Sequence, residues 1–291
     1  MTELDTIALI RLLAGSPEGR LLVGIGDDCA AWQPRPGLQL LFTTDQLIEG
    51  VHYRKSLPPS GARRAGARLV GRGLSDIAAM GGDALLVFLS LALPPGRGRR
   101  WRVEFLRGFA AAARRYGVAW AGGDLSSTSG PVVASVTVVG EVPRGAALLR
   151  SGARPRDRVF VTGVLGRAPQ VITPRLAVGR FLSRRRLATA AIDLSDGLST
   201  DLGHLTQASF AGAIVKAGQI PKAGRLKEAL HRGEDYELLF TARPSARIPS
   251  RIAGVPIREI GRITRRREVL LEHPDGRRER LVPRGWEHFR S

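Results

Sequence analysis

The chain has 291 residues, with 45 Lys and Arg against 26 Asp and Glu, so its formal net charge is +19. This length suits one large domain or two ordinary ones, and the 43% hydrophobic content is that of a globular protein. No apolar run reaches the roughly 18 residues of a membrane-spanning helix, and the acidic start lacks the pattern of a secretory signal. The single cysteine, Cys29, excludes an internal disulfide and a cysteine-based zinc cluster. A soluble cytoplasmic protein that does not bind membranes is expected.

The excess of basic residues raises the question of an anionic partner. Only four of the 45 basic residues are lysines, and the chain also holds 35 Gly and 18 Pro. This composition is typical of a bias that affects the whole chain. Aromatic residues make up 5%, and no basic segment interleaved with aromatics resembles a surface for single-stranded nucleic acid. Nucleic-acid binding is therefore the less favoured hypothesis.

Short apolar runs alternate with amphipathic stretches, which is the pattern of a mixed α/β protein. In the first part of the chain, the pattern predicts strands over residues 38–42, 85–93 and 131–142, and helices over 63–80 and 101–116. Gly81-Gly82 and Gly117 follow the two helices, where glycine favours termination. Polar residues after the apolar runs predict turns at Thr43-Thr44-Asp45 and at Gly122-Gly123-Asp124.

Pro143, Gly145 and Gly152 interrupt this periodicity, which predicts a boundary between a domain of residues 1–149 and one of residues 150–291. Beyond the boundary, strands are expected over residues 157–161, 190–194, 211–215, 236–241 and 255–264, and a helix over 199–209. Residues 269–281 are expected to form a hairpin around Pro274-Asp275-Gly276.

Aspartates recur beside glycine or hydroxyl residues, in positions that the pattern predicts to be strand ends or turns. The five places are residues 26–28, 43–45, 75–76, 123–124 and 193–197. Carboxylates with hydroxyl and backbone oxygens are the ligands of hard cations, chiefly Mg²⁺. The five histidines and one cysteine are dispersed and form no rival set of metal ligands. One such place is as easily a cap or a turn, but five in one chain favour a metal site.

Several Mg²⁺ ions held by aspartates suit phosphoryl transfer, because the metals neutralise the nucleotide phosphates. The chain has neither a Walker motif nor the signature residues of a protein kinase. Gly24-Ile25-Gly26 is too short for a dinucleotide fingerprint. A nucleotide would therefore have to be held through a metal–carboxylate arrangement.

The chain contains a set of motifs in a fixed order: residues 24–28 (Gly-Ile-Gly-Asp-Asp), 43–45 (Thr-Thr-Asp), 49–52 (Glu-Gly-Val-His), 74–81 (Leu-Ser-Asp-Ile-Ala-Ala-Met-Gly), 122–124 (Gly-Gly-Asp), 150–153 (Arg-Ser-Gly-Ala), 193–198 (Asp-Leu-Ser-Asp-Gly-Leu) and 233–238 (Gly-Glu-Asp-Tyr-Glu-Leu). This set resembles the thiamine-monophosphate kinase family, within the aminoimidazole-ribonucleotide-synthase-like superfamily of ATP-using enzymes. They run over nearly the whole chain, and the Glu-Gly-Val-His and Gly-Glu-Asp-Tyr-Glu motifs favour the thiamine branch.

The resemblance implies a two-domain α/β fold of the α+β type, in which the sheet of the N-terminal domain pairs across a homodimer. The N-terminal domain would bind ATP and Mg²⁺, and the C-terminal domain would complete the active site. The implied reaction passes the γ-phosphoryl group of ATP to thiamine monophosphate in a cleft, and gives thiamine diphosphate and ADP.

The resemblance also implies roles for individual residues. The expected Mg²⁺ ligands are Asp28, Thr43, Thr44, Asp45, Asp76, Asp124, Asp193 and Asp196. The residues expected to contact ATP are Gly123, Asp124, Arg150 and Ser195. The residues expected to contact thiamine monophosphate are His52, Glu234 and Trp286. No catalytic side chain is expected, because the acceptor phosphate is already largely ionised near neutral pH.

Each role has a structural alternative. His52 could be a histidine satisfied within the core or a loop, Glu234 and Asp235 could cap a turn, Trp286 could fill the core, and Arg150 could be a surface arginine. Two other functions stay open: another ATP-using enzyme of the superfamily, or a basic nucleic-acid-binding protein with vestigial enzyme motifs.

The chain departs from the usual pattern of the family in a few places. Gly73 stands where Asn usually precedes Leu-Ser-Asp, Leu125-Ser126 where Thr-Thr is usual, and Arg232 where a glycine is common. The stretch between Thr162 and Asp193 is shorter than is typical, with Thr173-Pro174-Arg175 as the remnant of a Pro-Arg element.

Overall fold

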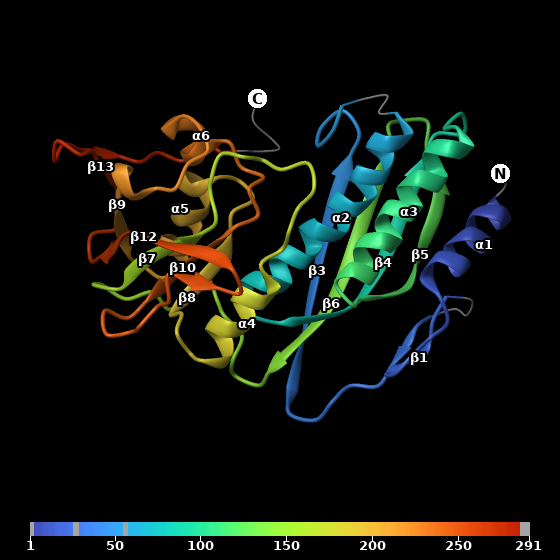
Figure 1. The fold of residues 1–291 in the computed structure, drawn as a ribbon, viewed down its shortest axis with the longest axis horizontal. Coiled ribbons are helices and arrows are strands. Elements are labelled where there is room, and N and C mark those ends of the chain that lie inside the picture. Colours follow the sequence, from blue (N-terminus) through green and yellow to red (C-terminus); the bar gives the residue numbers. More distant parts are fainter. Residues whose placement is uncertain (1–2, 26–28, 55–57, 286–291) are drawn as a thin grey trace. The chain divides into compact units, whose positions relative to one another are not determined.

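The computed structural model describes residues 3–25, 29–54 and 58–285, which form two compact units (Figure 1). Unit 1 is made of described residues within Met1–Ile77, Asp83–Arg144 and Gln170–Ile172. Unit 2 is made of those within Ala78–Gly82, Gly145–Pro169 and Thr173–Ser291. None of the described helices is both long enough and apolar enough to cross a membrane.

The sheet of unit 1 has the strand order β3-β6-β4-β5. These strands are β3 (Leu38–Ile48), β6 (Val133–Pro143), β4 (Asp83–Leu93) and β5 (Ala119–Ser127). β6 is antiparallel to both β3 and β4, while β4 and β5 are parallel and are joined by a helical crossover. The β-branched and aliphatic residues of these strands account for their extended conformation.

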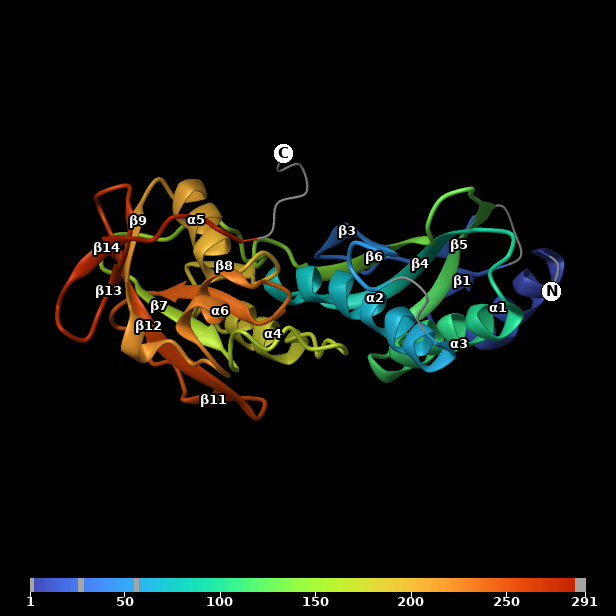
Figure 2. The same ribbon diagram turned by 90° about the horizontal axis from the view of Figure 1, so that it is seen from above.

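Two helices, α2 (Pro59–Ala79) and α3 (Arg99–Arg115), cover one face of this sheet (Figure 2). Their apolar sides are buried, including Leu69 on α2 and Phe105 on α3, both 0% exposed. The helices also approach each other closely: a Cβ at Gly108 would lie 1.9 Å from the carbonyl oxygen of Arg63. Glycine is therefore required at this position for the two backbones to meet.

The other face of the sheet is only partly covered. The short strands β1 (Leu21–Val23) and β2 (Ala31–Trp32) pair with each other, and Leu21 packs against a small apolar cluster of β4, β5 and β6. The helix α1 (Glu3–Ala14) contacts α3 and β5. On β3, Phe42 is 68% exposed and Leu40 is 41% exposed. This face thus presents apolar side chains at one edge of the sheet.

The sheet of unit 2 runs in the order β14-β13-β9-β12-β7-β10-β8, with β11 paired to β12. Its strands are β7 (Arg158–Thr162), β8 (Ala190–Asp193), β9 (Gly212–Lys216), β10 (Leu238–Ala242), β11 (Arg251–Ile252), β12 (Val255–Thr264), β13 (Val269–Glu272) and β14 (Arg278–Arg280). Neighbouring strands are antiparallel except for β13 and β9, which are parallel.

Helices pack on both faces of this second sheet. Residues of α5 (Leu198–Ala208) and α6 (Leu226–His231) share one apolar cluster with the strands, and residues of α4 (Leu176–Arg184) share another. A 3₁₀ turn, η1 (Ala217–Gln219), follows β9. Unit 2 is therefore a layered α/β unit with the sheet in the middle.

The predicted α/β fold class is confirmed, as are both predicted helices of unit 1 and the hairpin of β13 and β14. The predicted turn at 43–45 is wrong, because β3 continues to Ile48 and pairs with β6 along its whole length. The predicted turn at 122–124 is also wrong, since β5 runs through it to Ser127. Asp76 lies inside α2, not at a turn. The helices α1, α4 and α6 were not predicted.

Candidate functional site

In unit 1, two of the predicted acids lie where β3 faces α2. The Thr43 hydroxyl donates a hydrogen bond to the Asp76 carboxylate, and Arg72 Nη2 lies 3.2 Å from Asp45 Oδ1. Side chains alternate between faces along a strand, so Thr43 and Asp45 share the face that α2 covers. The structure thus brings Thr43, Asp45 and Asp76 together beside the C-terminal part of α2.

Thr44 and Asp124 lie on the opposite face of the same sheet. Thr44 alternates with Thr43 and Asp45, and Asp124 stands in a cross-strand row with Gln46, which is two residues after Thr44. Asp124 is exposed, on a strand three positions away from β3, or about 14 Å at the usual strand spacing. Within one chain, Asp124 therefore does not join the Thr43 group.

Gly123 precedes Asp124 in β5 and stands opposite Leu89 of β4. A Cβ at this position would lie 1.9 Å from the carbonyl oxygen of Leu89. Glycine is therefore required for the pairing of these two strands, whatever else it contacts. Asp28, the remaining predicted ligand of this unit, lies outside the described residues.

His52 belongs to the tight turn that follows β3. The Ile48 backbone N–H donates to His52 Nδ1 at 3.0 Å, so the neutral ring carries its proton on Nε2. Beside it, the Glu49 side chain is 5% exposed, forms an ion pair with Arg97 and accepts the Val132 N–H at 3.3 Å. Burial, and next the charge of Glu49, raise the pKa of the neighbouring Tyr53. Glu49 belongs to the Glu-Gly-Val-His motif but was given no role from the sequence, and Arg97, which pairs with it, lies in none of the motifs.

In unit 2, the residues 193–197 form a loop between β8 and α5. Asp193 ends β8 and is 5% exposed, and Gly197 begins the turn into α5 with a φ of 104°. Asp201 of α5 fixes the loop, because its carboxylate accepts the N–H groups of Asp196 at 3.1 Å and Gly197 at 3.0 Å. This local pattern, an aspartate one turn into the helix, orders the loop that carries both predicted ligands.

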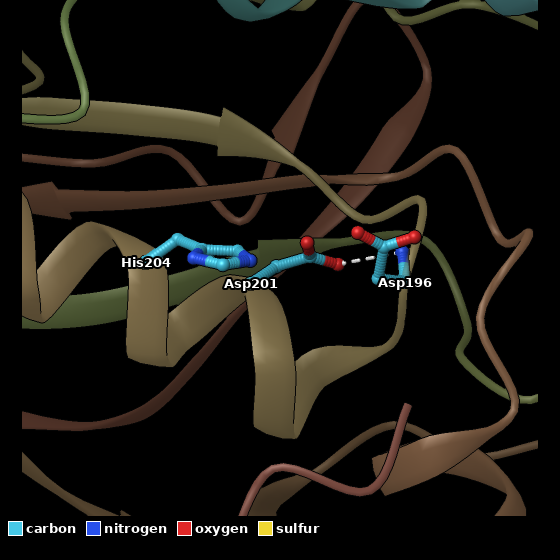
Figure 3. A group of neighbouring side chains, drawn as sticks. All are labelled: Asp196, Asp201 and His204. Carbon is cyan, nitrogen blue, oxygen red and sulfur yellow. Dashed lines mark hydrogen bonds between the residues drawn. The ribbon is translucent and has the colours of Figure 1, made fainter. Parts of the chain in front are cut away.

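Asp201 is also an electrostatically unusual group. Burial, followed by the charges of Asp193 and Asp196, raises its pKa to about 8, although two backbone hydrogen bonds act in the opposite direction. Its carboxylate lies with Asp196 and His204 in a group whose ligand atoms are all within 4.8 Å of one another (Figure 3). A cation would relieve this repulsion among carboxylates. The sequence reasoning missed Asp201 and His204, although their spacing of three residues on a helix places them on one face.

Glu234 and Ser195 lie in adjacent loops. The Glu234 N–H donates to the Ser195 carbonyl at 2.7 Å, and the Tyr236 N–H donates to the Leu194 carbonyl at 2.8 Å. Asp235 has a structural part: its carboxylate accepts the N–H groups of residues 166–168, and burial raises its pKa. Asp235 therefore has the structural role that was the alternative to a role in binding. The backbone of Glu234 lies beside the 193–197 loop.

Arg150 lies within the described residues, and Trp286 does not. Arg150 is exposed, and its backbone carbonyl accepts a hydrogen bond from the Ser209 hydroxyl at 3.0 Å. Trp286 lies outside the described residues. Its predicted role toward the substrate therefore stays a prediction.

A cavity of about 630 Å³ lies on the helical layer of unit 1, between α2 and α3. Its walls carry four arginines, which are Arg63, Arg64, Arg100 and Arg115. Among the described residues that line it, none is a predicted site residue. The cavity therefore does not coincide with any of the predicted site residues that the structure describes.

Several known proteins resemble this chain over most of its length. Residues 26–142 match the family of AIR synthase related proteins, N-terminal domain. The chain is 34% identical over 297 residues to a thiamine-monophosphate kinase of Rhodopirellula baltica, covering 92% of each chain. A crystal structure of thiamine-monophosphate kinase from Stenotrophomonas maltophilia K279a is 34% identical, with a TM-score of 0.79 over 94% of this chain and 95% of that one. A structure of AaThiL complexed with AMPPCP and TMP is 29% identical, with a TM-score of 0.78 over 99% and 97%.

Proposed function

This chain belongs to the thiamine-monophosphate kinase family, and we propose how its residues carry out the reaction of that family. The chain is a kinase that transfers the γ-phosphoryl group of ATP to thiamine monophosphate, giving thiamine diphosphate and ADP. The observation that carries this function is the extent of similarity to curated kinases, over 92% of the chain, together with the acids described above. Because ATP is a cytoplasmic metabolite, we place the enzyme in the cytoplasm.

Mg²⁺ is the cation that we propose for the group in unit 2. Asp193 and Asp196 supply carboxylate oxygens, and Asp201 adds a third carboxylate next to Asp196. Oxygen ligands of this kind fit a hard divalent cation. The pKa of Asp201, raised first by burial and then by the charges of Asp193 and Asp196, supports the fit, since a cation would stabilise the ionised carboxylate there.

The group in unit 1 offers oxygen ligands of the same kind. Asp45 and Asp76 are carboxylates on the covered face, and Thr43 adds a hydroxyl that already contacts Asp76. We propose these three as Mg²⁺ ligands and keep Asp28, Thr44 and Asp124 as predicted ligands from the same motifs. Asp124 and Thr44 would act from the other face of the sheet. A cation held by these residues would supply positive charge that offsets the negative charge of the phosphates during transfer.

The substrates are placed by residues around these acids. A solved relative holds AMPPCP and TMP together, which supports binding of ATP and thiamine monophosphate by this chain. We propose that Gly123, Arg150 and Ser195 contact ATP, and that His52, Glu234 and Trp286 contact thiamine monophosphate. The Nε2–H tautomer of His52 offers a hydrogen-bond donor, which suits a phosphate oxygen. The Glu234 carboxylate suits the cationic thiazolium ring.

The chemistry does not need a general base from the chain. The acceptor is a phosphate monoester that is largely ionised near neutral pH, so its oxygen is already a nucleophile. The residues of the chain therefore act by alignment and by charge: His52 and Glu234 orient the acceptor, and the acids hold the cation. For this reason no residue of the chain is proposed as a general base or as a covalent nucleophile.

Product analysis tests the function directly. Purified protein with ATP, Mg²⁺ and thiamine monophosphate is expected to form thiamine diphosphate and ADP in equal amounts, measured by anion-exchange chromatography. Omission of Mg²⁺, or addition of excess EDTA, is expected to stop the reaction. A folded protein that forms no thiamine diphosphate would contradict the function, and another phosphate or a carbonyl acceptor of the superfamily would be tried next.

We propose a homodimer formed through the uncovered face of the sheet of unit 1. Phe42 and Leu40 expose large apolar side chains there, and apolar surface of this kind is common at subunit interfaces. The substitution Phe42→Glu is expected to convert a dimer into monomers, measured by size-exclusion chromatography with light scattering. Leu12→Glu, on the exposed surface of α1 at 78% exposure, is the matched control. A dimer that survives Phe42→Glu unchanged would contradict this interface.

A further inference from the structure

Residues 233–237, here called the Glu234 loop, have a strained backbone. Glu234 and Tyr236 both have positive φ angles, 59° and 52°, which residues with a side chain rarely adopt. Strain of this kind persists only where surrounding contacts over-determine the conformation, and it concentrates at functional sites. The contacts that hold the Glu234 loop therefore bear on its function.

One anchor of the loop is the buried side chain of Asp235. It accepts the Gly166 N–H at 2.7 Å, the Arg167 N–H at 2.8 Å and the Ala168 N–H at 3.0 Å. These bonds tie the middle of the loop to the turn that follows β7. The end of the loop, next to the start of β10, is held by a different set of contacts.

The second anchor is a buried ion pair between Arg175 and Glu237. Arg175 Nε donates to Glu237 Oε2 at 2.7 Å, and its Nη2 donates to the other carboxylate oxygen, so the pair is bidentate. Thr162, which is fully buried, donates its hydroxyl to Glu237 Oε2 and accepts the Leu238 N–H at 2.8 Å. The Glu237 side chain is 6% exposed and that of Arg175 is 20% exposed.

The surroundings of Glu237 are built to admit its carboxylate. Gly163 has a φ of 58°, and a Cβ there would lie 2.0 Å from Glu237 Oε1. Any other residue would push the carboxylate out of its position. On the opposite side, the Leu194 N–H donates to the Glu237 carbonyl at 2.8 Å, which joins the same residue to the 193–197 loop.

We propose that Arg175 is a positioning residue for thiamine monophosphate: its bidentate pair with Glu237 holds the Glu234 loop against residues 193–197. Glu234 then keeps the place from which it meets the substrate. This inference rests on the proposed function, because it takes the role of Glu234 toward thiamine monophosphate from there. It also gives the Pro-Arg remnant at residues 173–175 a purpose.

Stability alone is a poor explanation for this pair. A buried ion pair loses most of its Coulomb gain to desolvation, and apolar residues of similar volume often serve stability equally well. A bidentate pair does fix direction, because both carboxylate oxygens and two guanidinium nitrogens must align. The pair is therefore better suited to setting the geometry of a strained loop than to adding free energy of folding.

The variants Arg175→Met and Arg175→Lys test the proposal, with Arg277→Met as the control. Arg277 also pairs with a glutamate, at 3.0 Å, but it lies on the exposed terminal hairpin. Loss of the pair is expected to lower kcat/KM for thiamine monophosphate by about tenfold to a hundredfold, through KM, the range typical of a misplaced binding group. The KM for ATP is expected to stay near that of the wild type. Lysine keeps the positive charge but cannot donate the two parallel hydrogen bonds of the guanidinium group. Arg175→Lys is therefore expected to fold normally and still show the raised KM.

A second measurement does not depend on turnover. The amide protons of Glu234 and Tyr236 are bonded to the 193–197 loop, so hydrogen exchange of residues 233–237 is expected to speed up in both variants and not in the control. Guanidinium ions added at millimolar concentration are expected to restore the KM of an Arg175→Ala variant, whereas sodium ions are not.

The outcomes separate the two proposals. Unchanged exchange, or a lowered melting temperature with a normal KM for thiamine monophosphate, would overturn the positioning role. Faster exchange in the variants, with a wild-type protein that forms no thiamine diphosphate, would leave the loop anchor standing and refute the proposed function.

Discussion

Asp124→Asn is expected to lower kcat by about a thousandfold, equivalent to about 4 kcal/mol of transition-state stabilisation, while leaving the melting temperature unchanged. Asparagine has the shape of aspartate but carries no charge, so a cation held there loses its strongest attraction. Asp124 is exposed on β5, so the substitution removes no buried contact. Steady-state rates at saturating ATP and thiamine monophosphate, measured over a range of Mg²⁺ concentrations, give both the kcat and the metal dependence.

The corresponding substitution Asp45→Asn is expected to affect both turnover and stability. Turnover is expected to fall by a similar factor, because Asp45 is proposed to bind the same kind of cation. Asp45 also pairs with Arg72 in a largely buried setting, so Asp45→Asn is expected to lower the melting temperature as well. The exposed Asp275→Asn, in the hairpin turn, is the control for both variants. Near-normal turnover in either site variant would contradict its assignment as a metal ligand.

The sequence predicted the elements whose patterns are local. The helices α2 and α3 and the hairpin of β13 and β14 have their periodicity and terminators within short windows, and the structure confirms them. The extent of β3 was not predictable in this way. Polar residues after Phe42 resemble a turn, but β6 supplies a pairing partner up to Ile48, and Arg72 of α2 balances the charge of Asp45. Those partners lie far along the chain, where no local window includes them.

In the candidate site, too, features within a short stretch of sequence were predictable, and features that depend on distant contacts were not. Motifs that are contiguous in the chain, such as residues 193–197, could be predicted as acidic loops. The contributions of Asp201 and His204 depend on the turn of α5, and that of Arg175 depends on a partner 62 residues away. The placement of Thr44 and Asp124 on the face opposite Asp45 follows from strand register, which motifs do not reveal. Contiguous motifs can thus be recognised in the sequence, whereas contacts between them depend on strand register and on packing between distant segments.

The contact of α2 with α3 leads to the largest expected effect on stability. Gly108→Ala is expected to lower the free energy of unfolding by about 3 kcal/mol, measured by urea denaturation followed by circular dichroism. The added Cβ would lie 1.9 Å from the Arg63 carbonyl oxygen and 2.7 Å from its carbon, so two helix backbones must separate. Backbone atoms cannot move aside as a flexible side chain does. The helix preference of alanine over glycine offsets the loss only in part, by about 1 kcal/mol.

A second helical glycine provides the matched control. Gly203 lies within α5, and a Cβ there would meet only the Pro283 side chain, at 3.7 Å, an ordinary van der Waals contact. Gly203→Ala is therefore expected to raise the free energy of unfolding by about 0.5–1 kcal/mol, because alanine loses less conformational entropy in a helix. The same chemical change should thus have opposite signs at the two sites. If Gly108→Ala were neutral or stabilising like its control, α2 and α3 could not pack as closely as these contacts require.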